Sequence, residues 1–521
     1  MKKTNLILLF IGVLSLLFTV SCSDGLDEVY SRLDDLENKK EQEPKIISMS
    51  FLAQDNPYQL SGDVDCIIEG DSIISCWIPN IVMSKVLIPH YTVPENAIVL
   101  SGGGKIVSGE TECDFSKPVE LTVTTGSKKN NYTVYVHTFT GLPVCYIDAE
   151  GRVSIESKEE YVNATIRIVE DVVTRAAGDV FEGDVQIKGH GNTTWTRFPK
   201  KPFRLKFSEK VSLLDEPKDK SWLLLANYAD KTLLRNELTF YLSRISCLDY
   251  TPSSHYVELI LNGSYQGTYQ LTDKLKISKN RVNVGDDGFL LEIDDYAPQE
   301  NDARFFRVNH LSQPCVNIKD PNVEYDDENY TYAKDFVLKA EETLFSEYFK
   351  DKDTGWRKYI DINTFVDYYI ITEITKNTDT MWGSSFMNLK RGGKLKMGPV
   401  WDYDLAYGNY SGIPAMADSE GFRVRNNPWY TRLFMDESFV SRVKERYAFF
   451  YARKNDVANW INSTASYLEY SVVENDNKWG VLYTDAWPNV YVMGSYKNEV
   501  QFLKEWIFKR MDWLKNEFDL M

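Results

Sequence analysis

Three aspartates in the second half of the chain stand where carboxylates are costly to bury. Asp379 follows an apolar helical stretch, and Asp402 and Asp404 lie inside residues 400–405, VWDYDL. Removing a lone carboxylate from water is unfavourable unless a cation or hydrogen-bond donors compensate it. The setting of these acids therefore indicates a bound cation or a catalytic role.

A divalent cation suits this pattern, because Mg²⁺ binds oxygen ligands, typically one or two carboxylates together with substrate phosphates. On a strand Asp402 and Asp404 would share one face, and on a turn they could converge. Asp379 is expected to face the same cavity from a loop, and the apolar neighbours would keep the site dry, which strengthens charge stabilisation. In the alternative interpretation, Asp379 and Asp404 are helix caps and Asp402 is a buried hydrogen-bond acceptor.

A glycine-containing loop follows a predicted strand farther upstream, in residues 188–195, KGHGNTTW. Gly189, Gly191 and Asn192 would let backbone N–H groups approach an anion. The spacing is neither a Walker loop nor a complete GxGxxG motif. An ordinary turn explains the pattern equally well.

A basic strand is predicted directly after this loop, in residues 198–207, FPKKPFRLKF. Its apolar residues alternate with Arg204 and Lys206, so the cations share one face. Together with Lys201 they predict a phosphate site, since Arg offers a bidentate fork and Lys a point charge. The alternative is a half-exposed strand with a solvated basic face.

Residues 223–236, LLLANYADKTLLRN, contain a further candidate pair. Asp230 is expected to cap the helix that follows, because Asp accepts an N–H of the first helical turn. Arg235 is interpreted either as a surface charge or as a positioning residue.

The elements that position these residues change in character along the chain. From residue 142, strands are expected at 165–169, 185–188, 203–207 and 288–293, with a hairpin at 256–271 around Asn262-Gly263. Helical periodicity is expected at 233–242, 333–348, 362–376 and through most of 437–518. Strands that precede helices indicate an α+β class.

Composition restricts the class of protein. The 521 residues are 43% hydrophobic and 13% aromatic, which is typical of a globular chain with large cores. The formal net charge is −17. We expect no nucleic-acid partner, because sequence-independent nucleic-acid binding needs a basic face.

The first residues are typical of an export signal. Lys2 and Lys3 precede an apolar run over 6–20 that is short for a membrane span. Its end, LFTVSC, resembles a bacterial lipoprotein cleavage site, so 1–21 would be removed and Cys22 lipidated. The acidic residues that follow partly resemble surface-export signals of Bacteroidetes lipoproteins. We therefore expect a lipid-anchored protein of the outer membrane or cell surface; the alternative is ordinary secretion.

Two segments precede the mixed region. Residues 22–43 are interpreted as a tether with a short amphipathic helix, and 44–140 as an all-β sandwich of short strands. This run resembles the immunoglobulin-like modules of many Bacteroidetes lipoproteins. Cys66 and Cys76 flank a predicted turn and could face each other across a hairpin, either as a disulfide or as two buried thiols.

Residues 142–410 resemble the CotH family of spore-coat-type kinases. The resemblance rests on five ordered blocks: KGHGNTTWTRFPKKPFRLKF, DKSWLLLANYADKTLLRNELTFYL, VELILNGSYQGTYQLTDKLKI, GFLLEID and GPVWDYDLAYGN. It implies an atypical protein-kinase-like, two-lobe domain over 141–521. It also implies transfer of phosphate from ATP to a protein substrate with Mg²⁺ or Mn²⁺.

By the logic of kinases, the resemblance also implies roles for the three acids. Asp379 would accept the proton of the substrate hydroxyl, Asp402 would hold the metal, and Asp404 would support it. Two positions depart from the pattern: Ser384 stands where a second metal ligand such as Asn is expected, and Asp273 where Glu is expected.

Two other functions remain open. One is a catalytically inactive binding or scaffold protein of the cell surface, since fold alone does not settle function. The other is a carbohydrate-active protein that uses Asp379 and Asp402 as an acid pair. The second does not explain the basic strand beside the glycine loop.

Overall fold

A computed structural model describes residues 43–57, 59–60, 63–78, 85–138, 140–169, 180–485 and 487–521. The proposed leader and Cys22 lie outside these residues. The chain divides into two compact units, Met1–Thr138 and Phe139–Met521. No helix among the described residues is long and apolar enough to cross a membrane.

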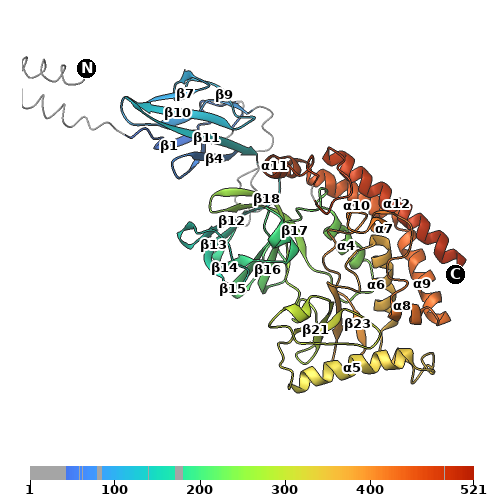
Figure 1. Ribbon diagram of the computed structural model, residues 1–521. Helices are drawn as coiled ribbons and strands as arrows, with labels where there is room; N and C mark the ends of the chain where they lie inside the picture. The colour runs from blue at the N-terminus through green and yellow to red at the C-terminus, as the bar shows by residue number, and fades with distance from the viewer. Residues whose placement is uncertain are drawn as a thin grey trace, which may run out of the picture. The chain divides into compact units, whose positions relative to one another are not determined.

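The first unit is built of short strands around its own core (Figure 1). Three strands pair in the order β2-β1-β6 and two as β5-β9, while a six-stranded sheet has the order β3-β4-β11-β10-β7-β8. Their bounds are β1 Ser48–Phe51, β2 Val64–Asp65, β3 Ile67–Glu69, β4 Ile73–Ile78, β5 Val86–Leu87, β6 His90–Thr92, β7 Ile98–Ser101, β8 Gly104–Ile106, β9 Cys113–Asp114, β10 Val119–Thr125 and β11 Lys128–Thr138. The prediction of an all-β segment is confirmed at this level.

A closed seven-stranded barrel begins the second unit, in the order β12-β13-β14-β15-β16-β18-β17. The strands are β12 Val144–Ala149, β13 Val162–Val169, β14 Val180–Gly189, β15 Phe203–Val211, β16 Asp219–Leu225, β17 Ser254–Leu261 and β18 Ser264–Asp273. On β15 the apolar residues Phe203, Leu205 and Phe207 fill the barrel core. The alternation seen in the sequence therefore separates a core face from an outer face.

The rest of the second unit combines a smaller sheet with helices (Figure 1). The sheet has the order β20-β21-β19-β22-β23, from β19 Phe289–Asp294, β20 Phe305–Phe306, β21 Cys315–Asp320, β22 Ser385–Leu389 and β23 Leu395–Met397. The helices are α3 Thr193–Arg197, α4 Arg235–Arg244, α5 Glu328–Phe345, α6 Ile362–Thr375, α7 Pro414–Ala417, α8 Pro428–Leu433, α9 Glu437–Tyr451, α10 Lys454–Tyr467, α11 Glu469–Trp479 and α12 Tyr496–Leu520. The α+β class is confirmed, although strands β22 and β23 interrupt the helical region.

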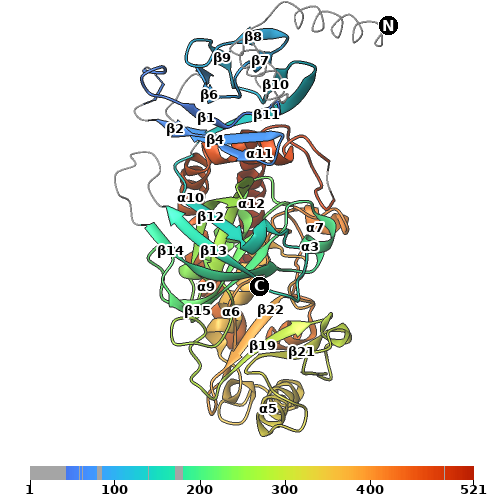
Figure 2. The same ribbon diagram turned by 90° about the vertical axis from the view of Figure 1, so that its left-hand side faces the viewer.

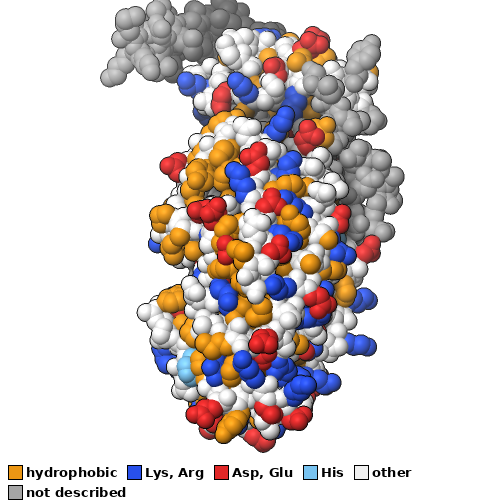
Figure 3. Space-filling view, turned by 90° about the vertical axis from the view of Figure 1, so that its right-hand side faces the viewer, with side chains coloured by type: hydrophobic (Ala, Val, Ile, Leu, Met, Phe, Trp, Pro, Cys, Tyr) orange, Lys and Arg blue, Asp and Glu red, His pale blue; other side chains and the backbone are white. Residues whose placement is uncertain are grey.

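Helix α6 is the centre of the helical part. It packs against α9 and α12 and carries the segment that leads to Asp379. In Figure 2, α5 lies at the end of the unit near β19 and β21. On the face seen in Figure 3, Lys and Arg side chains are interspersed with Asp and Glu.

A buried ion pair joins two of these helices. Arg510 of α12 and Glu373 of α6 are both fully buried, and Arg510 Nη2 lies 2.8 Å from Glu373 Oε2. Arg510 also donates to the carbonyls of Ser419 and Gly421, and Glu373 accepts backbone N–H groups of the segment that starts at Arg423. Arg510, the polar residue on the otherwise apolar face of α12, therefore fixes the backbone around residues 419–423 through Glu373 and its own hydrogen bonds.

Replacing Arg510 with methionine should destabilise this unit strongly. The substitution leaves the Glu373 carboxylate buried without its cation, which typically costs about 3–5 kcal/mol. Chemical denaturation of wild type and Arg510→Met measures the difference. Lys509→Met is the matched control, because Lys509 is the exposed neighbour on the same helix, and a loss of equal size in the control would contradict this assignment.

Candidate functional site

Asp402 and Asp404 lie in a loop, so the strand alternative is wrong for them and the turn alternative is right. Asp402 has a φ of 66°, in the left-handed region. Its side chain is exposed, whereas Val400 and Tyr403 beside it are buried. The loop thus buries its apolar residues while Asp402 keeps contact with solvent, although burial of its carboxyl still raises the pKa of Asp402.

Side chains of helix α4 hydrogen-bond to the backbone of this loop. Asn236 Oδ1 accepts the backbone N–H of Tyr403 at 2.7 Å, and Arg235 Nε donates to the carbonyl of Ala406 at 3.1 Å. The N–H of Tyr407 donates to the carbonyl of Thr375 at the end of α6. The loop is therefore fixed between two helices that lie far apart in the sequence.

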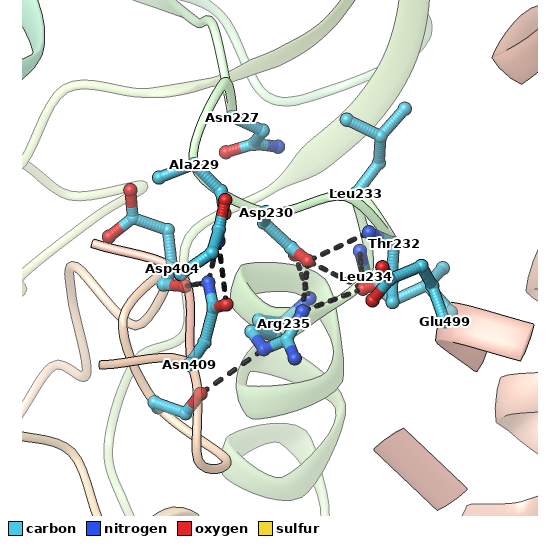
Figure 4. Close-up of polar contacts among 12 residues, drawn as sticks. Asn227, Ala229, Asp230, Thr232, Leu233, Leu234, Arg235, Asp404, Asn409 and Glu499 are labelled. Carbon is cyan, nitrogen blue, oxygen red and sulfur yellow. Dashed lines mark hydrogen bonds and ion pairs between the residues drawn. The ribbon is translucent and has the colours of Figure 1, made fainter. Parts of the chain in front are cut away.

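Arg235 is buried at 2% exposure, so it is a positioning residue and not a surface charge. It forms an ion pair with Asp230, and Asp230 Oδ2 accepts the backbone N–H of Arg235 at 2.8 Å (Figure 4). Asp230 thus serves the first turn of α4, as expected. In Figure 4 the carboxylate of Asp404 points away from Arg235, so Arg235 does not neutralise it.

Asparagines complete the support of Asp404. Asn409 Nδ2 donates to the carbonyls of Asp404 and Ala229, each at 2.9 Å. Asn489 then donates to Asn409 Oδ1 and to the carbonyl of Ala229. These hydrogen bonds fix the main chain at Asp404 and do not involve its carboxylate.

Asp379 lies in a tight turn just after α6. Its carbonyl accepts the N–H groups of Trp382 and Gly383, and the turn continues to Ser384, whose Oγ donates to Asp402 Oδ2 at 3.2 Å. The turn therefore brings Asp379 and Asp402 into one site. Ser384 supplies an oxygen beside Asp402 at the position where Asn was expected.

The charges of the three carboxylates affect one another. Burial and the negative charge of Asp402 raise the pKa of Asp379 to about 6. Burial, followed by the charges of Asp402, Asp379 and Asp230, raises the pKa of Asp404 well above its usual value. None of the three forms an ion pair with any residue in the described part of the chain. Arg423 lowers the pKa of Asp379 only in part, so negative charge still predominates in this loop and favours a cation.

The donor set suits Mg²⁺ or Mn²⁺ only in combination with ligand oxygens from elsewhere. Within the described ranges, no group of three or more His, Cys, Asp or Glu side chains is arranged to hold a metal ion. Asp402 and Asp404 offer carboxylate oxygens, the ligand type that a hard divalent cation binds. A cation here would therefore need phosphate or water oxygens to complete its shell.

A basic row runs across the outer face of the barrel, composed of Lys188 on β14 and of Arg204 and Lys206 on β15. Lys188 pairs with Arg204 across the two strands. All three lie within 6 Å of the ring centroid of Tyr161, and Arg204 Nε is buried without a hydrogen-bond partner. This row can accept an anion.

Three polar side chains connect the barrel with the acidic loop. Gln270 of β18 lies on the outer face, since its neighbours Tyr269 and Leu271 fill the barrel core. Asn227 Nδ2 donates to Gln270 Oε1 at 3.0 Å, and Asn236 Nδ2 donates to Asn227 Oδ1 at 3.1 Å. Asn236 in turn holds the N–H of Tyr403, so the face of the barrel that carries the basic row is tied to the loop of Asp402.

The glycine loop and Lys201 are occupied by local contacts. Gly189 N–H donates to Ser157 and is close to Trp195, whose ring a Cβ at position 189 would meet at 2.5 Å. Gly191 has a φ of 76°, and Asn192 Oδ1 accepts from Lys158 Nζ. Lys201 Nζ donates to the carbonyl of Trp195 at 2.6 Å. These residues shape the loop around α3 and lie apart from the carboxylates in the hydrogen-bond network.

Two other polar residues, Lys200 of the basic segment and Asp273, have structural roles. Lys200 is buried, donates to Thr268 and Asn475, and joins the barrel to α11; burial lowers its pKa to about 7. Asp273 forms an ion pair with Arg281 at 3.0 Å and accepts from Tyr250. Asp273 therefore anchors the chain after β18.

The supporting residues Asn227, Asn236, Asn409 and Asn489 were not predicted from the sequence. Asparagine is common in turns and caps, so its type alone does not distinguish a loop residue from a buried bridge. Asn227 and Tyr407, like Asp402, have a left-handed φ and lie around the same site. Such backbone angles are not predictable from composition.

Fold and site together define a mixed α+β protein with an acidic loop clamped between two helices and a basic row on an adjoining barrel. A family model described as CotH kinase protein matches residues 185–514. The chain therefore belongs to the CotH family. A second model, described as SGBP, N-terminal, matches residues 57–136.

No curated relative matches the chain. A solved structure from Bacteroides fragilis, provisionally described as a secreted protein, is 14% identical with a TM-score of 0.15, over 19% of this chain and 97% of that chain. Another from Bacteroides thetaiotaomicron, provisionally described as a glycoside hydrolase, is 14% identical with a TM-score of 0.17, over 56% of this chain and 82% of that chain. Likenesses at these TM-scores carry no argument about function.

Proposed function

We propose that this protein transfers the γ-phosphate of ATP to serine or threonine of a protein substrate, with Mg²⁺ or Mn²⁺. The observation that carries the proposal is the set of three carboxylates without ion-pair partners, on loops held by α4 and α6. Membership of the CotH family supports the same reaction class.

The surroundings of each acidic residue indicate its role in the proposed reaction. Asp402 and Asp404 would hold the metal, which neutralises phosphate charge during transfer. Asp379 would accept the proton of the acceptor hydroxyl, because a carboxyl with a pKa of about 6 is largely deprotonated at neutral pH and can act as a base. Ser384 would orient Asp402 through its hydrogen bond.

Phosphate oxygens of ATP would meet the basic row. Arg204 is the first choice, because its Nε is buried without a partner and its guanidinium matches phosphate geometry. Lys206 and Lys188 would add point charges. Lys201 and the loop of Gly189, Gly191 and Asn192 would support the row through α3.

Arg204→Gln should weaken ATP binding about tenfold or more, since a charge-assisted hydrogen bond to phosphate is worth roughly 1.5–3 kcal/mol. Thermal shift over a series of ATP concentrations with Mg²⁺ or Mn²⁺ measures the change. Lys210→Gln is the matched control, being an exposed cation on the same strand. Equal weakening by both substitutions would remove Arg204 from the site.

The remaining features of the proposal concern architecture and location. The barrel and the helical part would correspond to the two lobes of an atypical kinase, and the first unit to an immunoglobulin-like module. A lipid on Cys22 would anchor the protein in the outer membrane or at the cell surface.

Cys22→Ser should then abolish lipid labelling, and unchanged labelling would refute the anchor.

A catalytically inactive surface binding or scaffold protein is the second candidate. The observation in its favour is Ser384, whose single hydroxyl replaces the amide expected of a second metal ligand. A scaffold would show no metal-dependent effect of ATP on thermal stability. This absence at millimolar ATP would favour it over the kinase.

A further inference from the structure

Two cysteines face each other in the first unit. Strands β3 and β4 pair antiparallel with Ile67 opposite Ser75 and Glu69 opposite Ile73. One more step of this register brings Cys66 opposite Cys76. The distance between directly opposed residues of an antiparallel pair falls in the range that a disulfide spans.

The side chains of this hairpin confirm which way the two thiols point. Ile67 and Ile73 are exposed at 36% and 38%, whereas Ile74 and Cys76 are buried. Since side chains alternate along a strand, Cys66 points to the same face as Cys76, and it packs against the same core. A side-chain hydrogen bond with Cys76 is the main cause of the raised pKa of the Cys66 thiol, which agrees with two neighbouring side chains.

The other cysteines of the described residues have different surroundings. Cys113 packs against the same core as Cys66 but lies on β9, which pairs with β5 among the described strands, and Cys145 is enclosed in the barrel core. Cys66 and Cys76 are both free thiols; residue Cys66 is partly exposed and Cys76 is buried, so Cys66 is the member of the pair nearer to solvent.

We propose that Cys66 and Cys76 form a disulfide across the β3–β4 hairpin when the protein meets a thiol-oxidising partner. The Cys66 thiolate attacks a sulfur of a disulfide oxidant, such as oxidised glutathione or a disulfide-carrying oxidoreductase, and releases one thiol. The Cys76 thiolate then attacks the Cys66 sulfur of the mixed disulfide and releases the second thiol. Two protein thiols are oxidised and one oxidant disulfide is reduced to two thiols.

The bond would close a short loop in the first unit and leave the candidate site in the second unit unchanged. Closing a loop restricts the unfolded chain, and this stabilises the native hairpin. The hydrogen bond to Cys76, followed by burial, raises the pKa of the Cys66 thiol, so oxidation should be slow near neutral pH and faster at higher pH.

The test uses the purified full chain with oxidised glutathione as the probe. Trypsin leaves Cys66 and Cys76 on one peptide, 46–85. After alkylation, the oxidised chain should yield this peptide without alkyl groups and lighter than the reduced peptide by two hydrogen atoms. Cys66→Ser and Cys76→Ser should each abolish it, whereas Cys113→Ser should leave it. Cleavage by protease within 43–138 should be about tenfold or more slower in the oxidised chain.

Two results would overturn the proposal. One is alkylation of both Cys66 and Cys76 in the native chain after prolonged oxidation at pH 8 to 9. The other is a stable glutathione adduct on Cys66 that Cys76 does not displace. Peptide mass mapping of the wild-type chain detects both the alkylated cysteines and the glutathione adduct. The test therefore does not depend on the folding of any variant.

Discussion

Asp402→Ala should abolish the metal-dependent stabilisation of the protein by ATP. Asp402 is the exposed carboxylate of the loop, oriented by Ser384 and unpaired by any described cation. Its removal takes away a principal oxygen ligand and leaves Asp404, whose pKa is still raised by burial and by the charges of Asp379 and Asp230. Thermal shift with ATP and Mg²⁺ or Mn²⁺, against metal-free samples, measures the loss.

The matched control is Asp335→Ala, because Asp335 is an exposed aspartate on α5, away from the acidic loop. It should keep the full shift. If Asp402→Ala retains a wild-type shift while remaining folded, Asp402 is not a metal ligand, and Asp379 with Asp404 would have to be considered instead.

Asp379→Asn should lower phosphoryl transfer by roughly a hundredfold or more, the usual scale for loss of a general base. It should leave the ATP-dependent thermal shift in place, because the role of a base is felt in the transition state. The turn should persist, since its hydrogen bonds to Trp382 and Gly383 come from the Asp379 carbonyl.

The pH dependence separates a base from a structural acid. A group with a pKa of about 6 is protonated below that pH and cannot accept a proton. The rate should therefore rise with pH through about 6 or lower, since a cation on Asp402 removes part of the charge that raises the pKa of Asp379. In Asp379→Asn this limb should disappear, and its survival would assign the limb to another group.

The fold was predictable where one side of an element faces a core. Alternation at Phe203, Leu205 and Phe207 predicted β15, because these residues fill the barrel. Strand β16 was not predicted from the sequence. Both faces of this strand are buried, with Leu223 on the outer face and Trp222 and Leu224 on the inner face, so its residues show no alternation of polar and apolar side chains. Closure of the barrel by the parallel pair β12 and β17 depends on contacts distant in sequence.

The site was predictable to the level of residue type. Acids among apolar neighbours identified Asp402 and Asp404, but not the positive φ that turns Asp402 to solvent. The bridge from Asn236 to Tyr403 spans 167 positions in the sequence, and no local pattern encodes it. Arg510 is a polar residue on an otherwise apolar face of α12, and its partner Glu373 is 137 positions away.

Phosphate transfer from labelled ATP tests the central claim most directly. Wild-type protein with Mg²⁺ or Mn²⁺ is incubated beside Asp402→Ala and Asp379→Asn, with the protein itself and a casein-like acceptor as substrates. The proposed function predicts labelled serine or threonine with wild type, dependence on the metal, and loss of label in both variants. Metal-dependent ATP binding by wild type without any labelled product, or equal labelling in all three proteins, would contradict it.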